Sequence, residues 1–288
     1  MIAELVCPAC RGRLVELACT DCGSAYEVID GIPILISGDS ESAAQQAAFF
    51  DDADDPEFEI ERPFGLPGLY TWLLHEKYRR GTHGVSLRDR SALVVCGGSG
   101  MDAEFLARSG AEVISSDISL GAAKRALERS RRHGVPISAI VANAERLPFV
   151  DRSVDVVYVH DGLHHLENPL DGLAEMARVA RHAVCVTEPS QAAVTALAVK
   201  LGISENVEEA GNRVARLTLS EVREILEGQS FRVARAQRYA MFYRHEPGPV
   251  MKGLSVPVVF LAARLAYRMA NAVLAPVGNK LVVTAVRP

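Results

Sequence analysis

The sequence predicts an α/β protein with a doubly wound, mostly parallel sheet of seven strands and a small metal-binding module in front of it. Two patterns support this prediction. Strand-like apolar runs alternate with helical segments from residue 91 onward, and two Cys-x-x-Cys motifs lie near the N-terminus. The composition agrees, because 49% of the residues are hydrophobic and 23% are charged, as in an ordinary globular protein. A chain of 288 residues is long enough for one large domain and one small module.

The N-terminal module, residues 1–39, is expected to be a zinc ribbon. Cys7, Cys10, Cys19 and Cys22 form the pattern CPAC–x8–CTDC, whose four thiolates can close around a tetrahedral Zn²⁺. About forty residues bury too little surface to fold alone, so a metal would supply the missing stability. Four protein ligands leave no open coordination position, so the site is structural. A pair of reduced thiol motifs without metal is the alternative.

Residues 40–90 are expected to form an acidic linker and lid helices. The run "GDSESAAQQAAFFDDADDPEFE" is acidic, and its charges are most simply a solvated face. The segment "GLYTWLLHEKYRRG" has apolar residues at helical spacing and ends at Gly81. This helix is predicted to pack on the front of the next domain, over its ligand.

The domain from residue 91 to 288 supplies the alternating strands and helices. Strands are predicted in "ALVVCGGSG", "AEVISSDIS", "ISAIVANAERLPF", "VDVVYVHDG" and "HAVCVTEPS", and the last two in "RVARAQRYAMFY" and "KLVVTAVRP". Helices are predicted in "MDAEFLARSG", in "LGAAKRALERSRRHG", which has a basic outer face, and in "NPLDGLAEMARVA". Repeating β-α units of this kind place a ligand at the carboxyl ends of the strands.

The first turn of this domain is rich in glycine. Gly97, Gly98 and Gly100 let the backbone pass from strand to helix and approach a ligand closely, as a dehydrogenase would also require. Asp117 closes the second strand, where a carboxylate can accept hydrogen bonds from both hydroxyls of a ribose. The alternative for Asp117 is a cap at the start of the next helix.

Three segments in this region resemble successive motifs of class I S-adenosylmethionine-dependent methyltransferases. They are "VVCGGSGMDAEFLARSGAEVISSDIS", "VANAERLPFVDRSVDVVYVHDGLHHLENP" and "CVTEPS", and the similarity is greatest to the group that methylates small molecules and quinones. The pattern CPxC…CxxCG…GIPxLI similarly resembles Trm112-like zinc ribbons. The resemblance implies a Rossmann-like methyltransferase fold, S-adenosylmethionine as cofactor, and structural zinc.

Carried onto this sequence, the resemblance implies roles for individual residues. Gly98 and Gly100, with Gly97, would line the methionine and ribose side of the cofactor, and Asp117 with Ile118 would hold the ribose. Asn143 and Ala144 would meet the adenine, and His160 would lie beside the cofactor. The chain departs from the pattern at Cys96, where a glycine is usual, at Val94, where an acid is frequent, and at Asn143, where aspartate is more frequent.

The segment "HDGLHHLENP", residues 160–169, follows the fourth strand of the domain and would open onto the ligand crevice. In similar small-molecule methyltransferases a Leu-His-His segment contributes a general base, helped by an acid after the next strand. The matching residues are His164, His165 and Glu188. If the segment is extended, His164 and His165 cannot both face the pocket. The alternative is that one histidine caps the following helix and the other is solvated; a metal site here is disfavoured because Gly162 favours a loop.

The C-terminal third is predicted to carry helical insertions at about 191–228 and 246–277. Ser220, followed by Glu221 and Glu224, resembles the capped start of a helix. The second insertion is strongly apolar, with Arg264 and Arg268 four residues apart. It is compatible with a lid over a lipophilic acceptor, a dimer surface, a membrane-surface anchor, or a helix packed in the core. Its charges leave an uncharged stretch too short to span a bilayer, so no transmembrane span is expected. The aromatic residues before it are expected to line an acceptor pocket: Tyr239, Phe242, Tyr243 and His245.

The leading hypothesis is an enzyme that transfers a methyl group from S-adenosylmethionine to a small molecule, natural-product or lipophilic in character, with a homodimer as a further expectation. An RNA base methyltransferase is the second hypothesis, supported by the ribbon and by a basic strip. A net charge of −5 argues against it. A non-catalytic binding protein with the same fold is the third. No signal peptide opens the chain, so a cytoplasmic protein is expected. The strip consists of Lys124, Arg125, Arg129, Arg131 and Arg132.

Overall fold

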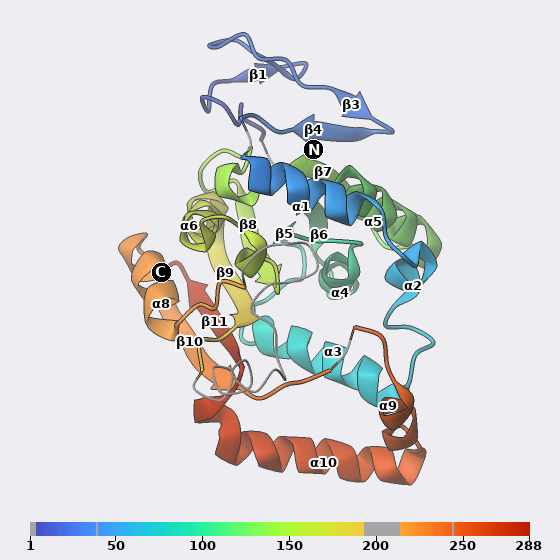
Figure 1. Ribbon diagram of the computed structural model, residues 1–288. Coiled ribbons are helices and arrows are strands. Elements are labelled where there is room, and N and C mark those ends of the chain that lie inside the picture. Colours follow the sequence, from blue (N-terminus) through green and yellow to red (C-terminus); the bar gives the residue numbers. More distant parts are fainter. Residues whose placement is uncertain (1–3, 39, 193–213, 244) are drawn as a thin grey trace.

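A single mixed sheet organises the chain (Figure 1). The computed structural model describes residues 4–38, 40–192, 214–243 and 245–288, and in these residues the sheet has nine strands. The strands follow the spatial order β10 (Arg232–Tyr239), β11 (Lys280–Val286), β9 (Ala180–Pro189), β8 (Val154–His160), β5 (Ser91–Val95), β6 (Glu112–Asp117), β7 (Ile137–Ala142), β4 (Ile32–Leu35) and β3 (Val28–Ile29).

The seven strands expected from the sequence are present and have the expected directions. Strands β5 to β9 pair in parallel, and β11 enters antiparallel between β9 and β10. The ribbon adds two strands that were not predicted to join, because β4 pairs in parallel with β7 and β3 pairs with β4. Ile32 and Leu35 of β4 are fully buried, so the apolar end of the ribbon covers an edge that would otherwise be open.

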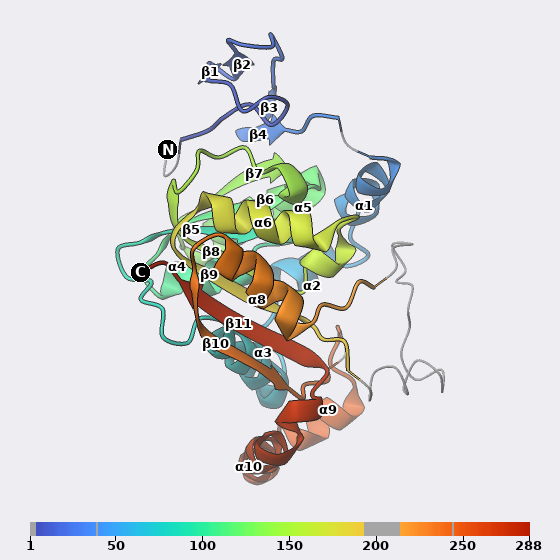
Figure 2. The same ribbon diagram turned by 90° about the vertical axis from the view of Figure 1, so that its left-hand side faces the viewer.

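Helices cover both faces of the sheet, as the prediction of a doubly wound fold requires (Figure 2). On one face lie α3 (Gly68–Gly81), α4 (Met101–Arg108) and α5 (Leu120–His133), and on the other α6 (Pro169–Val179) and α8 (Leu219–Gly228). Successive strand residues point to opposite faces, so Ala92 and Val94 pack toward α4 while Leu93 and Val95 pack toward α6. Strands buried on both faces explain why these segments are continuously apolar.

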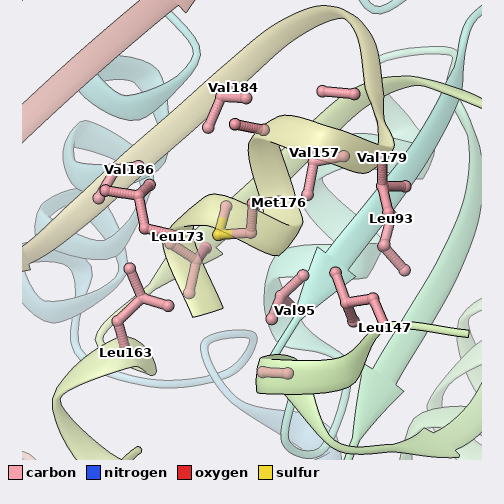
Figure 3. Close-up of a cluster of buried hydrophobic side chains, with 14 of the residues drawn as sticks. Leu93, Val95, Leu147, Val157, Leu163, Leu173, Met176, Val179, Val184 and Val186 are labelled. Atoms are coloured by element: carbon pink, nitrogen blue, oxygen red, sulfur yellow. The ribbon is translucent and has the colours of Figure 1, made fainter. Parts of the chain in front are cut away.

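The larger core lies between the sheet and α6. Figure 3 shows Leu173 and Met176 of α6 packed among Val157, Val184 and Val186 of the central strands. Leu163, from the loop after β8, is buried in the same cluster. The loop that carries the histidines is therefore anchored by its own apolar residue.

The helix boundaries follow local capping. The side chain of Ser119 caps α5 at its start, and Gly134 ends it in the left-handed conformation, with φ 62°. Helix α8 begins two residues earlier than the sequence indicated, because Thr218, rather than Ser220, is the N-cap. Thr218 and Glu221 form a capping box. The remainder of the predicted insertion at 191–228, residues 193–213, lies outside the described residues.

Two helices replace most of the expected acidic linker. Helix α1 (Glu41–Asp51) and α2 (Pro56–Glu61) begin at the side-chain caps Ser40 and Asp55. Most of their acidic groups are exposed, as predicted, but several also make contacts with α5. Asp51 accepts hydrogen bonds from Ser119 and Gly121 at the start of α5, and Glu57 and Glu61 pair with Arg132 near its end. The domain boundaries at residues 39 and 90 stay a prediction.

The C-terminal insertion contains α9 (Pro249–Leu254), α10 (Pro257–Leu274) and the short η3 (Ala275–Val277). Figure 1 shows α10 at the lower edge of the molecule, beside α3 and away from the sheet. Most of its large apolar side chains are exposed, so the alternative of a helix packed in the core is wrong. By length and composition, Pro257–Val277 could cross a membrane, with 21 residues and a mean hydropathy of 1.4; one such helix is weak evidence for a span.

Candidate functional site

A cavity of about 900 Å³ lies at the carboxyl ends of the central strands. Parallel pairing brings these ends together, so Gly98 after β5, Asp117 at the end of β6, Asn143 after β7 and His160 at the end of β8 all line it. Helix α1 closes the cavity from the front through residues such as Phe50. The volume is large enough for a nucleoside-sized cofactor and a second small molecule.

The three glycines of the loop have different surroundings. Gly98 has φ 51°, lines the cavity, and has nothing within 4 Å of the place a Cβ would occupy. A Cβ on Gly97 would lie 2.2 Å from Oγ of Ser115, and one on Gly100 would lie 2.9 Å from Cβ of Ala126. Gly100 is buried and does not line the cavity. Gly98 is therefore open to a ligand, whereas Gly100 is required for packing the loop on α5.

Asp117 organises the turn between β6 and α5. Its Oδ2 accepts the backbone N–H of Gly98 at 2.8 Å, and its Oδ1 accepts that of Ser119 at 3.0 Å. Burial raises the pKa of Asp117, and these two backbone hydrogen bonds only partly offset it. Asp117 is not the N-cap of α5, a position that Ser119 holds. Further donors, such as sugar hydroxyls, would stabilise this carboxylate.

Ile118, Asn143 and Ala144 line the cavity beside Asp117. Oδ1 of Asn143 accepts the backbone N–H of Glu145 at 2.8 Å and so caps the short helix η1 (Ala144–Arg146). An aspartate would accept the same hydrogen bond, so the replacement of the frequent aspartate by Asn143 preserves the local backbone.

The histidine loop is held by one buried carboxylate. Glu188 is fully buried; its Oε1 accepts the N–H groups of Gly162 and Leu163, and its Oε2 lies 2.8 Å from Nδ1 of His164. A carboxylate can only accept here, so Nδ1 of His164 carries a proton, and in the neutral ring the lone pair is on Nε2. Glu188 does not line the cavity and acts through His164.

Both histidines line the cavity, which corrects the expectation for an extended segment. Leu163–His165 forms the short helix η2, so successive side chains do not alternate between opposite faces. The rings of His164 and His165 lie 4.1 Å apart, and His165 also meets the ring of Phe50 edge-on at 5.5 Å. The alternative that a histidine caps the following helix is wrong, because Asn168 is the N-cap of α6 and makes no side-chain cap hydrogen bond.

A charge network absent from the sequence interpretation lies on the acceptor side of the cavity. Asp161 accepts Nζ of Lys77 at 2.8 Å and Nζ of Lys280 at 2.6 Å, and Lys77 also contacts the hydroxyl of Tyr243. Burial would raise the pKa of Asp161, but the two lysines outweigh it and hold this pKa well below its usual value. The sequence analysis did not single out Lys77, because its role depends on which face of α3 meets the cavity.

Asp102 and His160 form a second pair. Nδ1 of His160 lies 2.9 Å from Oδ2 of Asp102, in the first turn of α4. Burial would raise the pKa of Asp102, but the adjacent His160 lowers it overall. Asp102 lines the cavity next to Gly98 and can supply the acid that is missing at Val94.

The predicted aromatic lining is present in part. Phe242, Tyr243 and His245 line the cavity. Tyr239 does not; it is fully buried in the cluster beneath, with Leu69 and Leu73 of α3.

The basic strip on α5 is not a free cationic surface. Arg129 is fully buried against Glu104, and Arg125 donates to the backbone oxygens of Phe50 and Asp51 in α1. The remaining members are paired with acids: Lys124 with Asp30, Arg131 with Glu128, and Arg132 with Glu57, Glu61 and Glu128. Contacts within α5 and to α1, α2, α4 and the ribbon therefore account for these charges.

The four N-terminal cysteines converge. Their sulfur atoms all lie within 4.8 Å of one another, with Cys7 and Cys22 at 3.7 Å and Cys10 and Cys19 at 3.4 Å. A tetrahedral ion with Zn–S bonds of about 2.3 Å would separate its sulfurs by about 3.8 Å. The N–H groups of Gly12 and Asp21 point at the sulfurs of Cys10 and Cys19, which suits thiolates. In the described residues this is the one cluster with metal-ligand geometry.

Comparisons with known proteins identify the central part of the chain. Residues 93–185 match the family model described as a methyltransferase domain. Demethylmenaquinone methyltransferase of Renibacterium salmoninarum is 37% identical over 89 residues, which cover 31% of this chain and 36% of the relative. A ubiquinone/menaquinone biosynthesis C-methyltransferase of Proteus mirabilis is 32% identical over 118 residues, covering 38% of this chain and 47% of the relative. The chain thus spans less than half the length of these curated relatives.

Solved structures share the fold. Magnesium protoporphyrin IX methyltransferase of Synechocystis, with bound SAH, superposes with a TM-score of 0.56 at 15% identity, covering 86% of this chain and all of that one. A complex of the Haloferax volcanii Trm112 methyltransferase activator with a methyltransferase superposes with a TM-score of 0.53 at 18% identity, covering 88% of this chain. The predicted Rossmann-like methyltransferase fold is confirmed.

Replacing Asp161 by asparagine is expected to destabilise the protein at neutral pH. The change leaves Lys77, 1% exposed, without its counter-ion. Loss of a buried partner costs about 3–5 kcal/mol, and about 2–3 kcal/mol is expected here because Asp161 is 23% exposed. The depressed pKa of Asp161 gives stability that is present above its unfolded pKa and lost as pH falls through its folded pKa. Urea unfolding should therefore show a gap from wild type at pH 7 that narrows below about pH 4.

The matched control is Asp151→Asn, whose ion pair with Arg178 is exposed on the Asp151 side. It should change stability by less than about 1 kcal/mol at either pH. If the Asp161→Asn variant is as stable as this control at pH 7, the ion pairs of Asp161 with the two lysines do not stabilise the fold.

Proposed function

Starting from a chain that carries a methyltransferase domain on a methyltransferase-type fold, we propose that this protein transfers a methyl group from S-adenosylmethionine to a small-molecule acceptor. The main support is one juxtaposition: the open Gly98 and the buried carboxylate of Asp117 meet at the edge of the sheet, inside a cavity large enough for two ligands. Bound S-adenosylmethionine would supply an electrophilic methyl group next to the acceptor.

The residues present fit this cofactor. Asp117 would accept the ribose hydroxyls, which would compensate the burial that raises its pKa. Asn143, Ala144 and Ile118 would flank the adenine, and Gly98 would let the backbone approach the methionine part. Asp102 would attract the methionine amino group and takes over the function of the acid missing at Val94. Aspartates and glutamates outnumber lysines and arginines along the cavity, which favours a cationic ligand.

The histidine loop would prepare the acceptor. With Nδ1 bound to Glu188, Nε2 of His164 is the nitrogen that can take a proton from an acceptor hydroxyl. Glu188 stabilises the imidazolium that results and fixes the ring, so it is a positioning residue. His165 would serve as the alternative base. Positioning of the acceptor supplies the rest of the rate enhancement.

The acceptor is proposed to be a lipophilic phenol or hydroquinone. The two relatives named above are quinone methyltransferases, and the methyltransferase-domain model covers residues 93–185, which include the histidines. The acceptor side of the cavity carries Met241, Phe242 and Tyr243, which suit a flat apolar ring. Loss of the hydroxyl proton would make the ring oxygen, and the ring carbons conjugated to it, nucleophilic.

Zinc is proposed to hold the ribbon through Cys7, Cys10, Cys19 and Cys22. The convergence of four sulfurs supports a structural ion. An RNA substrate receives less support, because the arginines of α5 that could contact phosphates are paired within the protein. A cytoplasmic location and a homodimer stay predictions.

Asp117→Ala is expected to weaken S-adenosylmethionine binding by at least about tenfold. Each hydrogen bond to a charged group contributes about 1.5–3 kcal/mol, and the variant removes the acceptor of two. Isothermal titration calorimetry measures the change, with Asp151→Ala as a control for loss of a surface acid. Wild-type protein that binds no S-adenosylmethionine would refute the proposed enzyme and favour a binding protein.

His164→Ala is expected to lower kcat by about a hundredfold or more with a small change in KM, because it removes a base and not a contact needed for binding. Transfer of radiolabelled methyl from S-adenosylmethionine to demethylmenaquinol provides the assay. Added imidazole should restore part of the activity, and Glu188→Gln should lower kcat in the same direction. His182→Ala, an exposed histidine at the opposite end of β9, is the control. Unchanged kcat in His164→Ala would exclude His164 as the base.

Cys10→Ser is expected to abolish stoichiometric zinc and to lower Tm. Wild type should contain one zinc per chain by inductively coupled plasma mass spectrometry, and the variant should contain little. Because the ribbon adds β4 to the sheet, Tm should fall by about 5 °C or more. Cys185→Ala, a core cysteine outside the cluster, should keep its zinc even though its Tm falls. Zinc-free wild type would contradict the assignment.

A further inference from the structure

Helix α10 presents an apolar row to solvent. Its inner side packs through Phe260, Ala263 and Tyr267 against Trp72, Leu69 and Leu73 of α3. Its opposite side carries large apolar side chains that are 60% to 84% exposed and recur every three or four residues, so they lie on one face. This outer row consists of Val258, Leu261, Leu265, Met269 and Val273. A helix with apolar side chains on two opposite sides is expected to contact an apolar partner on each side.

The exposed apolar surface is concentrated here. Among the described residues, all but three of the exposed large apolar side chains lie between Phe242 and Val277; the three are Val15, Val28 and Phe49. The helix is also firmly seated, because Asn271 both donates to and accepts from the backbone of Ala240, and Ser255 accepts the N–H of Leu69 at the start of α3. The apolar row is therefore a fixed surface of the folded protein, and patches of this kind mark interaction sites.

The charge of this segment identifies the kind of partner. Residues 247–288 contain no aspartate or glutamate, although the whole chain has a net charge of −5. Lys252 is exposed on α9 and Arg268 is exposed on α10, whereas Arg264 is directed inward, over the rings of Trp72 and Phe260. Two copies joined through this face would bring Lys252 and Arg268 close to their counterparts, and neither α9 nor α10 has an acid to pair with them. An anionic lipid surface would complement both the apolar row and the cations.

We propose that α9 and α10 bind the surface of an anionic phospholipid bilayer. The geometry favours a helix in the plane of the interface over a membrane span. Arg264 and Arg268 lie midway along α10, and their guanidinium carbons are 5.1 and 5.9 Å from the ring centre of Trp72. The inner side of α10 is thus attached to a helix that carries Glu76 and Arg79, so only the outer row is available to lipid.

The surface is continuous with the cavity. Met241, Phe242 and Tyr243 line the cavity, and the chain runs from them directly into α9 (Figure 1). Phe242 is 81% exposed at this border. Docking would place the acceptor side of the cavity at the membrane, so that a lipophilic acceptor could enter without crossing water. This route rests on the proposed function, whereas the docking itself does not.

Vesicle flotation of the full chain tests the proposal. Wild type should float with vesicles of phosphatidylcholine containing phosphatidylglycerol and much less with phosphatidylcholine alone. Leu261→Glu with Leu265→Glu should weaken binding at least about tenfold, because two apolar contacts are replaced by repelled charges. Lys252→Gln should weaken it about fivefold. The matched control, Val15→Glu with Val28→Glu, places two acids on exposed apolar positions of the ribbon and should bind as wild type does.

Three outcomes would overturn the proposal. The first is that wild type does not float with anionic vesicles. The second is that the Leu261→Glu, Leu265→Glu variant floats as well as the control does. The third is that wild type does not bind vesicles but forms a dimer in analytical ultracentrifugation, and that this variant is a monomer. Calorimetry with S-adenosylmethionine separates this proposal from the proposed function. The Leu261→Glu, Leu265→Glu variant should bind the cofactor as wild type does, which also shows that it is folded. If wild type binds vesicles but not S-adenosylmethionine, the membrane-binding proposal is supported and the proposed methyltransferase activity is refuted.

Discussion

Parallel pairing of five strands is the constraint on which the candidate site depends. Strands β5 to β9 run in the same direction, so their carboxyl ends meet at one edge of the sheet. Each strand contributes something different there: a glycine turn, Asp117, Asn143, His160, and finally Glu188 beneath the histidine loop. Residues up to about ninety positions apart become neighbours through backbone hydrogen bonds alone. The side chains then need only local capping to reach their positions.

Buried charges refine this arrangement. Arg129, fully buried, pairs with Glu104, donates to the backbone oxygen of Ser99 in the glycine loop, and reaches the backbone of α2. Glu188 likewise fixes the loop after β8 by accepting its backbone N–H groups, and Asp161 fixes the side chains of Lys77 and Lys280. Removing charges from water is costly, so such groups persist only where every partner is in place. The cavity is therefore surrounded by elements whose positions are specified by electrostatics as well as by packing.

Helix α3 connects the two surfaces on which function is proposed. On one side of α3, Lys77 lines the cavity. On another side, Trp72 packs against α10. The front helices α1 and α2 close the other side of the cavity by pairing with α5. The ribbon completes the sheet at its far edge through β4. The additions to the central domain thus act at two places: α1, α2 and α3 surround the cavity at the carboxyl ends of the strands, and the ribbon extends the sheet beside β7.

The sequence by itself determined the fold class, the order of the elements, the cysteine cluster and the cavity-lining residues at the ends of the central strands. Those features depend on local periodicity, on glycine and capping patterns, and on motif spacing, all of which are properties of short segments. It could not determine that Lys77, Lys280 and Asp161 meet, because these residues come from three elements that are distant in the chain. It also misjudged Arg129, which looks solvated in a basic helix but is buried, and it left open whether the apolar α10 lies in the core or at the surface. Burial depends on which faces of separate helices meet, and only the tertiary structure decides that.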